Sequence, residues 1–464
     1  MRTKIYLLSI IILFFTISIN AQTSIKNRYN KLRFDDNFSF LQNDSLKGDF
    51  FDPIKYIPLS SNPNVYLSMG GEIRHNYKLY KNDEWQPTLD ENGHFQHRYM
   101  FHTDFHLGNH LRVFSQVNSG LTYGRVPEPT AIIDENQFEV NQLFLEYVFG
   151  DRNKDFHLGI RVGRMEEMYG TARFIATREG QNVRRSFDGI HVFLGNDKWE
   201  MDVFALKQIV SMPGVFDDFR DPGESIYGAV LHTKGKGGIH YEPYVIINRD
   251  LTGLLFEVDG EEWHVTPGAR IFKNDKNLSW NVESAIQFGG FQDEKVFGYL
   301  VAGSIGYKFT GAKSNPYVGF KFNYSTGDSD GRPGGLGTFE PFFPKAVLGQ
   351  ASVINPANLI QFHLETSFNL FKNSRIILSH DQLFRASRSD VFYDPCGYQI
   401  VEITDDLSSA RYIGHQSRIA LKQRFGPHYT ILIEHIIFPP GTFLTEMGRT
   451  DVLHYTSIRS VFRF

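Results

Sequence analysis

The sequence predicts an all-β protein, a transmembrane antiparallel β-barrel of about 18 strands. Three observations predict it: an export signal at the start, apolar and polar residues that alternate along most of the chain, and connections that are alternately short and long. Aromatic residues make up 15% of the chain, yet long apolar runs are confined to its start. Alternation explains this combination, because successive side chains of a strand point to opposite faces of the sheet.

The first residues predict export from the cytoplasm. Arg2 and Lys4 precede an unbroken apolar run at 5–19, and Ala21 offers a small residue for cleavage. This is the layout of a secretory signal peptide, and the run is shorter than the about 20 apolar residues that a spanning helix needs. We therefore expect residues 1–21 to be a signal peptide.

The next part of the chain differs from the rest. Residues 22–64 lack clear alternation and contain three prolines. We expect this part to form an N-terminal periplasmic extension or a partial plug of the pore. The barrel itself is expected to span residues 65–464.

Period-two alternation is the main pattern of the expected barrel. In one strand, Phe101 and Phe105 share one face, while Arg98 and Asp104 share the other. A helix does not produce this pattern, because only a strand turns its side chains over at every residue. The eighteen expected strands lie near residues 65–80, 95–107, 110–121, 137–149, 155–166, 186–195, 198–209, 224–233, 239–249, 262–273, 278–290, 299–309, 315–326, 358–370, 374–386, 411–425, 428–439 and 452–464.

The connections between the expected strands are sorted by length. Gly108-Asn109 and Gly426-Pro427 are tight, whereas 167–185, 326–357 and 386–410 are long. Bacterial outer-membrane barrels have short periplasmic turns, long extracellular loops and both chain ends in the periplasm. Closure also gives every backbone polar group in the lipid a partner. The sequence therefore predicts the outer membrane of a Gram-negative bacterium.

The last expected strand ends in an aromatic residue. Phe464 ends the chain, and Thr456, Ile458 and Phe462 lie on the same strand face. A terminal aromatic on an amphipathic strand resembles the signal by which the outer-membrane assembly machinery recognises its clients. We expect this machinery as a partner, with outer-membrane lipid around the barrel.

Basic residues dominate the strand faces that we expect to line the pore. Eighteen strands enclose an aqueous channel unless loops fill it, and basic rings in a channel favour anions. Alternatively, these charges pair across strands and only neutralise one another. The basic residues of this face are Arg74, Lys78, Arg98, Arg112, Arg161, Arg270, Lys321, Arg418, Lys422, Arg424 and Arg459. The clearest acidic residues are Glu72, Asp104, Glu146, Glu283 and Glu365.

The densest basic cluster lies between the fifth and sixth expected strands. Arginine binds a carboxylate through two parallel hydrogen bonds, so the cluster would suit a polyuronate, which carries one carboxylate per sugar. The alternative is an arginine ladder bound to Glu166, Glu167, Glu179 and Asp188 that holds a folded loop, and both interpretations can hold together. The arginines of the cluster are Arg161, Arg164, Arg173, Arg178, Arg184 and Arg185.

Two stretches carry a resemblance to a known family. The stretch at 163–189, GRMEEMYGTARFIATREGQNVRRSFDG, resembles the signature region of the alginate export family of outer-membrane porins. The stretch at 323–344, NYSTGDSDGRPGGLGTFEPFFP, resembles the other recurrent region of that family. The resemblance covers roughly 65–464 and implies an eighteen-stranded barrel whose basic pore passes an anionic uronate polymer to the exterior. In this chain three glutamates dilute the positive cluster, which departs from a purely basic pore.

We therefore expect an outer-membrane channel with a basic lumen that exports an anionic polysaccharide such as an alginate-like polyuronate. The alternative is a general uptake porin for small anionic nutrients or oligosaccharides. The driving force for export would come from a gradient or from periplasmic partners, and neither function needs a cofactor. The net charge of −4 gives no sign of nucleic-acid binding.

The sequence suggests neither a catalytic site nor a metal site. His363, Glu365 and Ser367 share one strand face, but residues two apart on a strand are about 6–7 Å apart. A nucleophile and its base need about 3 Å, so we expect a channel and not an enzyme. The stretch at 328–331 resembles the opening of a calcium loop, but the glutamate at the twelfth position is not evident. A tight polar turn is the other interpretation of that stretch.

Overall fold

The computed structural model describes most of the chain. It covers residues 28–87, 92–125, 133–150, 156–255, 258–329, 336–345, 351, 353–395, 397–402 and 406–464, and only the backbone within 252–259. The expected signal peptide at 1–21 lies outside these residues. Within them, no helix is both long and apolar enough to cross a membrane.

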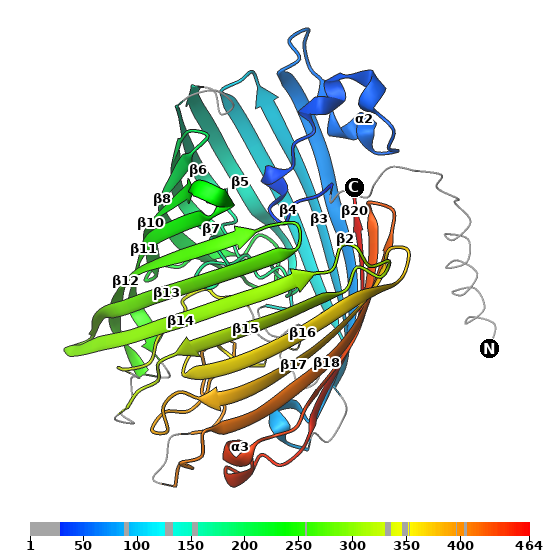
Figure 1. Ribbon diagram of the computed structural model, residues 1–464. Coiled ribbons are helices and arrows are strands. Elements are labelled where there is room, and N and C mark those ends of the chain that lie inside the picture. Colours follow the sequence, from blue (N-terminus) through cyan, green and yellow to red (C-terminus); the bar gives the residue numbers. More distant parts are fainter. Residues whose placement is uncertain are drawn as a thin grey trace.

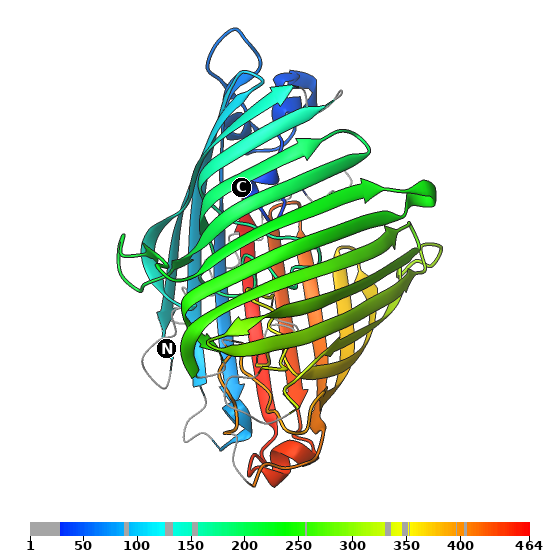
Figure 2. The same cartoon turned by 90° about the vertical axis from the view of Figure 1, so that its left-hand side faces the viewer.

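Eighteen antiparallel strands of the described chain form one closed barrel (Figure 1, Figure 2). They are β2 (Val65–Lys81), β3 (Asn92–Leu107), β4 (Leu111–Tyr123), β5 (Asn136–Gly150), β6 (His157–Met165), β7 (Phe187–Gly195), β8 (Trp199–Val210), β10 (Ser225–Lys234), β11 (His240–Leu255), β12 (Val258–Asn274), β13 (Leu278–Phe291), β14 (Glu294–Lys308), β15 (Tyr317–Ser325), β16 (Leu359–Phe371), β17 (Ser374–Arg385), β18 (Tyr412–Phe425), β19 (Tyr429–Phe438) and β20 (Leu453–Arg463). Consecutive strands of this series pair with each other, and β20 pairs with β2, where Arg463 lies opposite Glu72. The two-residue strands β1 (Ile57–Pro58) and β9 (Phe219–Arg220) pair with β2 and β8. The predicted eighteen-stranded barrel is confirmed.

The two ends of the barrel differ as the connection lengths predict. The chain enters the barrel beside the tight β3–β4 turn, where the backbone N–H of Gly108 donates to the carbonyl of Asn64 at 3.0 Å. In Figure 1 the short helix α2 (Asp52–Lys55) and the C-terminus lie toward this end, and α3 (Thr442–Glu446), between β19 and β20, lies at the other. The first end is therefore the periplasmic one, because short turns and chain ends gather there in bacterial barrels.

Two pairs of neighbouring strands extend further than the expected strand bounds. β11 and β12 continue toward each other until only residues 256–257 separate them. A register shift between Asp250 and Gly253 breaks the strict alternation there, so the sequence pattern did not reveal the continuation. β13 and β14 likewise meet at the two-residue turn Gln292-Asp293.

The strand faces divide as the alternation predicts. On β3, Phe95 and Phe101 are each 43% exposed on the outer surface, whereas Gln96 and Arg98 are buried on the inner face. A closed barrel in lipid needs an apolar outer face and can keep its polar groups inside. The inner face therefore carries the side chains that decide what the lumen binds.

The segment at 28–56, which we call the N-terminal segment, lies against the periplasmic end of the barrel and enters it. Arg33 donates to the carboxylate of Glu72 on β2 at 3.1 Å. The ring of Phe34 meets the rings of Phe114 and Phe144 edge-on, with centroids 6.1 and 5.5 Å away. These contacts fix the first described residues inside the wall formed by β2, β4 and β5.

Two loops fold back into the barrel. We call residues 166–186, between β6 and β7, the crossing loop, and residues 336–345, between β15 and β16, the companion loop. The backbone N–H of Phe343 donates to the carbonyl of Phe174 at 2.9 Å, and Ile175 forms a β-bridge with Phe343. Together with wall residues these loops form an apolar cluster inside the barrel, so the lumen is not an open tube.

Candidate functional site

The crossing loop spans the lumen from one wall to the opposite one. Near its start, Arg173 donates to Glu283 on β13 at 3.1 Å. Near its middle, the loop lies against β2 and β20, where Arg74 donates to the carbonyl of Glu179 and Arg459 to that of Gly180, both at 2.8 Å. β13 lies across the barrel from the β2–β20 junction in the strand order. The loop therefore divides the lumen at this level, and the side chains around it decide what can pass.

Most of the arginines that the sequence pointed to are neutralised by carboxylates. Eight of the twelve have an acidic side chain within ion-pair distance, brought there by strand register for the arginines on strands and by the fold of the crossing loop for Arg173 and Arg184. These described pairs are Arg98–Glu72, Arg112–Asp104, Arg161–Glu146, Arg164–Asp188, Arg173–Glu283, Arg184–Glu166, Arg270–Glu242 and Arg418–Glu434. The loop-holding interpretation thus describes the contacts of Arg164 and Arg184, while binding of a solute by these arginines stays a prediction.

The other four predicted arginines have different surroundings. Arg74 and Arg459 donate to loop carbonyls, which carry no net charge to offset theirs. The guanidinium of Arg185 lies 4.7 Å from the centre of the Phe343 ring. Arg178 is half-buried in the crossing loop, in a left-handed backbone conformation with φ of 54°.

Glu72 is the centre of the densest ion-pair network. It accepts hydrogen bonds from Arg33 of the N-terminal segment at 3.1 Å, from Arg98 on β3 at 3.1 Å and from Arg463 on β20 at 2.8 Å. Glu179 of the crossing loop also lies within 3.5 Å of Arg98. One carboxylate therefore joins the N-terminal segment, the closing strand and the wall that faces the crossing loop.

A basic cavity of about 220 Å³ lies at the periplasmic end, and we call it the periplasmic cavity. Two of its arginines have carboxylate partners, since Arg28 pairs with Asp49 and Arg463 with Glu72. Within the described chain, no carboxylate lies within ion-pair distance of its other three basic residues. Those three are Lys422, Arg424 and Arg459. The remaining lining residues are Tyr29, Pro427, Thr430, Leu432 and Val461, so none of the described residues that line this cavity is acidic.

A second basic cavity, of about 210 Å³, lies beside the crossing loop, and we call it the central cavity. Its charged lining consists of Arg173, Lys321, Lys345 and His363, and the rest is polar or small without a carboxylate. Burial lowers the pKa of Lys345, and the nearby ammonium groups of Lys31 and Lys321 lower it further. An anion bound among these cations would relieve this crowding.

Sequence reasoning placed Lys321, Lys422 and Arg424 on the lumen face but did not single them out. It missed Arg28 and Lys345, because neither lies on an alternating strand. It also undercounted the acids, since Glu242 and Glu434 face the lumen as ion-pair partners. The sequence carries no signal that separates the paired basic residues from the unpaired ones, because pairing depends on strand register and loop folding.

Of the stretch that resembles a calcium loop, only Asp328 and Ser329 lie within the described residues. The backbone N–H of Asp328 donates to the carboxylate of Asp390 at 3.0 Å and to the hydroxyl of Thr338 at 2.9 Å. These bonds hold the chain in a compact turn beside the companion loop. Calcium binding at this stretch stays untested.

Comparison with known proteins places the chain in one family. The alginate export family matches residues 65–455, nearly the whole expected barrel. No curated protein matches the chain.

Solved structures share the fold at very low identity. A BenF-like porin from Pseudomonas fluorescens Pf-5 superimposes with a TM-score of 0.57 at 7% identity, covering 86% of this chain and 98% of that one. OccK11 (OpdR) of Pseudomonas aeruginosa gives 0.55 at 8% identity, covering 88% and 98%. OccK2 (OpdF) of Pseudomonas aeruginosa in complex with glucuronate gives 0.56 at 6% identity, covering 90% and 99%. At such identities the likeness shows the fold alone.

Proposed function

We propose that this chain, which belongs to the alginate export family, conducts anionic solutes through the outer membrane past its two basic cavities, and that its cargo is an anionic polysaccharide. The chain is an outer-membrane β-barrel channel, as its family and fold establish. That the solute is anionic, and that it is exported, are the parts of the proposal that go beyond this family and fold assignment.

The observation that carries the proposal is that, among the described residues, no acidic side chain lines either cavity. Elsewhere in the described lumen, most of the predicted arginines pair with carboxylates, while Arg74 donates to a loop carbonyl and Arg185 lies against the ring of Phe343. At the two cavities, no carboxylate of the described chain lies in ion-pair contact with Lys422, Arg424, Lys321 or Lys345. Inside a channel such charges are screened less than on an open surface, so they attract anions and repel cations.

A uronate is the anion class that suits this lining. Arg424 and Arg459 carry planar guanidinium groups that can hold a carboxylate through two hydrogen bonds. OccK2, a structural neighbour of this chain, has been solved in complex with glucuronate. A chain of uronate units would place carboxylates at regular intervals, so that one polymer could contact the periplasmic and the central cavity together.

Block of the channel current by oligouronates tests the proposal. In planar bilayers an oligouronate should block the current, and a neutral oligosaccharide of equal length should not. The triple variant Lys422→Gln, Arg424→Gln, Arg459→Gln should weaken the block at least about tenfold, the loss expected from about 1.4 kcal/mol of binding energy. Equal block by the charged and neutral oligomers would contradict an anionic cargo.

Uptake of small anions is the second candidate function, and one observation favours it. The crossing loop and the companion loop fill much of the lumen with an apolar cluster that includes Phe174, Phe339 and Phe343. A polymer could pass only if these loops moved, whereas a small anion needs less room. Small monovalent and divalent carboxylates that permeate freely, with no block by the oligomer, would favour this function over export.

The proposal extends to the ends of the chain. We propose residues 1–21 as a signal peptide and the N-terminal segment as a partial plug, which the contacts of Arg33 and Phe34 inside the barrel support. Phe464 pairs with Gly71 through two backbone hydrogen bonds of 2.8 and 3.1 Å, which completes the closing seam. We propose that the assembly machinery binds this terminus before closure, and that periplasmic export partners meet the same end.

A further inference from the structure

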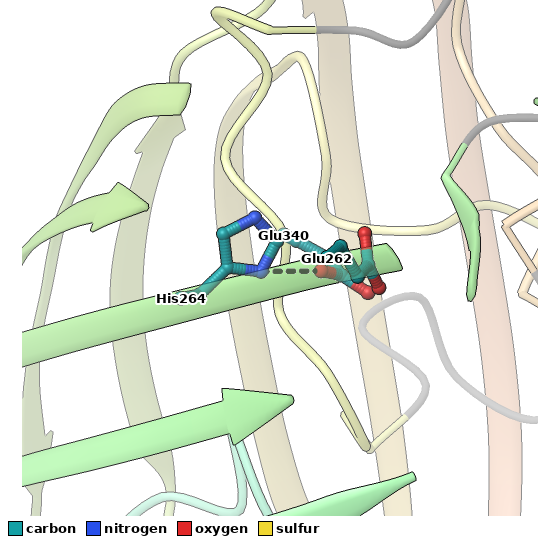
Figure 3. A group of neighbouring side chains, drawn as sticks. All are labelled: Glu262, His264 and Glu340. Atoms are coloured by element: carbon teal, nitrogen blue, oxygen red, sulfur yellow. Dashed lines mark ion pairs between the residues drawn. The ribbon is translucent and has the colours of Figure 1, made fainter. Parts of the chain in front are cut away.

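A third group of chargeable side chains lies inside the barrel, outside the lining of both basic cavities. Glu262 and His264 are two residues apart on β12 and share its inner face, and Glu340 reaches them from the companion loop (Figure 3). One ligand atom from each of the three lies within 4.8 Å of the others. We call these three residues the Glu–His–Glu cluster.

Burial leaves the polar atoms of this cluster without partners. His264 is fully buried, and neither ring nitrogen makes a hydrogen bond within the described chain. Glu262 is 4% exposed, and one of its carboxylate oxygens is also without a hydrogen bond, as is one of Glu340. Nδ1 of His264 lies 3.0 Å from Oε2 of Glu340, the contact drawn in Figure 3, but not in hydrogen-bonding geometry. Buried polar groups almost always have partners, so these atoms call for one.

We propose that Glu262, His264 and Glu340 bind one divalent transition-metal ion, and that Zn²⁺ fits best. An imidazole nitrogen with two carboxylates is a ligand set that zinc accepts, whereas calcium and magnesium prefer oxygen ligands alone. Zinc ligands about 2.0–2.1 Å from the ion lie about 3.3 Å from each other at a tetrahedral site. The 3.0 Å contact between His264 and Glu340 is already close to that spacing.

The charge of the ion also fits the site. In the metal-binding forms, two carboxylates and a neutral imidazole together carry a charge of −2, which a divalent cation would offset in a place where unpaired charge is costly. Deprotonated carboxylates and a neutral imidazole are also the forms in which these side chains bind metal.

A comparison with His191, another buried histidine of the lumen, shows one way in which this cluster differs. His191 has Glu167 at 2.9 Å from Nδ1 and Asp202 at 2.8 Å from Nε2. Its two carboxylates therefore lie on opposite sides of the ring and cannot share one ion with it. Both of its nitrogens are satisfied by protein groups, unlike those of His264.

The ion would join the barrel wall to the loops that fill the lumen. Glu340 is already held at its backbone, where its N–H donates to the side chain of Gln287 at 2.8 Å and its carbonyl accepts from the same side chain at 3.0 Å. Three residues later, Phe343 binds the crossing loop. A metal at the cluster would thus fix the companion loop to β12 and stabilise the division of the lumen.

Zinc titration of the folded full-length protein tests the proposal. Protein in detergent is stripped with a chelator, and ZnCl₂ is added in a calorimeter, with CaCl₂ in a parallel run. We expect one zinc ion per chain and no comparable calcium binding. His264→Gln and Glu340→Gln should each weaken zinc binding by more than about 100-fold, beyond what loss of an outer-shell partner causes. Glu261→Gln is the matched control, because Glu261 neighbours Glu262 but is exposed and pairs with Arg249.

A second measurement guards against misfolded variants. Each variant should keep its heat-modifiable migration on gels, which reports a closed barrel. Zinc should raise the temperature at which the wild type and Glu261→Gln lose that migration, and should not raise it for His264→Gln. Absence of stoichiometric zinc binding to the wild type would overturn the proposal. Folded His264→Gln or Glu340→Gln that binds zinc as tightly as the wild type would also overturn it.

Discussion

At the scale of single residues, one buried carboxylate, that of Glu72, joins three parts of this barrel. Glu72 accepts hydrogen bonds from Arg33, Arg98 and Arg463, which belong to the N-terminal segment, β3 and β20. All three elements meet where the last strand closes on the first. A buried ion pair adds little stability by itself, but removing one partner leaves a buried charge uncompensated.

Replacing this carboxylate should therefore destabilise the closed barrel. Glu72→Gln leaves three guanidinium groups without their shared anion, and loss of a buried partner costs about 3–5 kcal/mol. The midpoint of urea unfolding in detergent should fall accordingly. Glu261→Gln breaks only an exposed pair with Arg249, worth less than about 1 kcal/mol, and serves as the control. An unchanged midpoint for Glu72→Gln would show that the network does not stabilise closure.

Lys55 gives the N-terminal segment a pH dependence. Its ammonium group is buried, donates to the carbonyl of Met69 at 2.9 Å and lies 4.9 Å from the ring of Phe38. Burial lowers the pKa of Lys55 to about 7, and the positive charges of Arg33 and Arg28 lower it too, while Asp36 and Asp49 raise it. A lysine in a free segment has a pKa of about 10.4.

Docking of the N-terminal segment should consequently tighten as the pH rises. Between pH 7 and about pH 10 the undocked segment binds more protons than the docked one, so raising the pH in this window favours docking. Protease cleavage within residues 28–56 should become slower from pH 7 to pH 9.5, after correction for protease activity. Lys55→Met should remove this trend. Faster cleavage of the wild type at the higher pH would contradict the assignment.

At the scale of elements, the loops inside the barrel decide how wide the pore is. The crossing loop is held at its middle by Arg74 and Arg459 and near its start by Glu283, on opposite walls. Its apolar side chains pack with those of the companion loop. The strands supply a rigid wall, and these two loops supply the obstruction.

Removing the obstruction should raise the conductance. Replacing residues 171–181 with a short Gly-Ser turn deletes the part that reaches both walls, and the single-channel conductance in planar bilayers should increase. The barrel should still close, because the β6–β7 pairing does not depend on the deleted residues. A closed barrel with unchanged conductance would mean that the current already bypasses the crossing loop.

The sequence predicted the wall far better than its contents, for a physical reason. Alternation records which face each strand residue takes, so the placement of Arg98 inside and Phe101 outside followed directly. It does not record contacts across the lumen, such as that between Arg74 and Glu179, which are 105 residues apart. Strand register was also hidden, so the carboxylate partners of Arg270 and Arg418 could not be assigned.

At the scale of the whole molecule, the closed sheet has one orientation in the membrane. The short turns and both described chain ends lie at one end, which we assign to the periplasm. Single cysteines test this in a Cys396→Ser background. A membrane-impermeant maleimide should label Arg388→Cys in intact cells, because Arg388 is exposed in the loop between β17 and β18. It should label Asn109→Cys, in the β3–β4 turn, only after lysis, and the reverse pattern would invert the barrel.

The basic groups without carboxylate partners, and not the many paired arginines, should make this channel select anions. The reversal potential across a salt gradient in planar bilayers measures this selectivity most directly. The wild type should prefer anions, and Lys422→Gln, Arg424→Gln, Arg459→Gln together should move the reversal potential toward zero. The double variant Arg418→Gln, Glu434→Gln removes a 2.7 Å ion pair without changing the net charge, and should behave like the wild type. A wild-type channel that prefers cations, or a double variant that shifts as much as the triple one, would contradict this account.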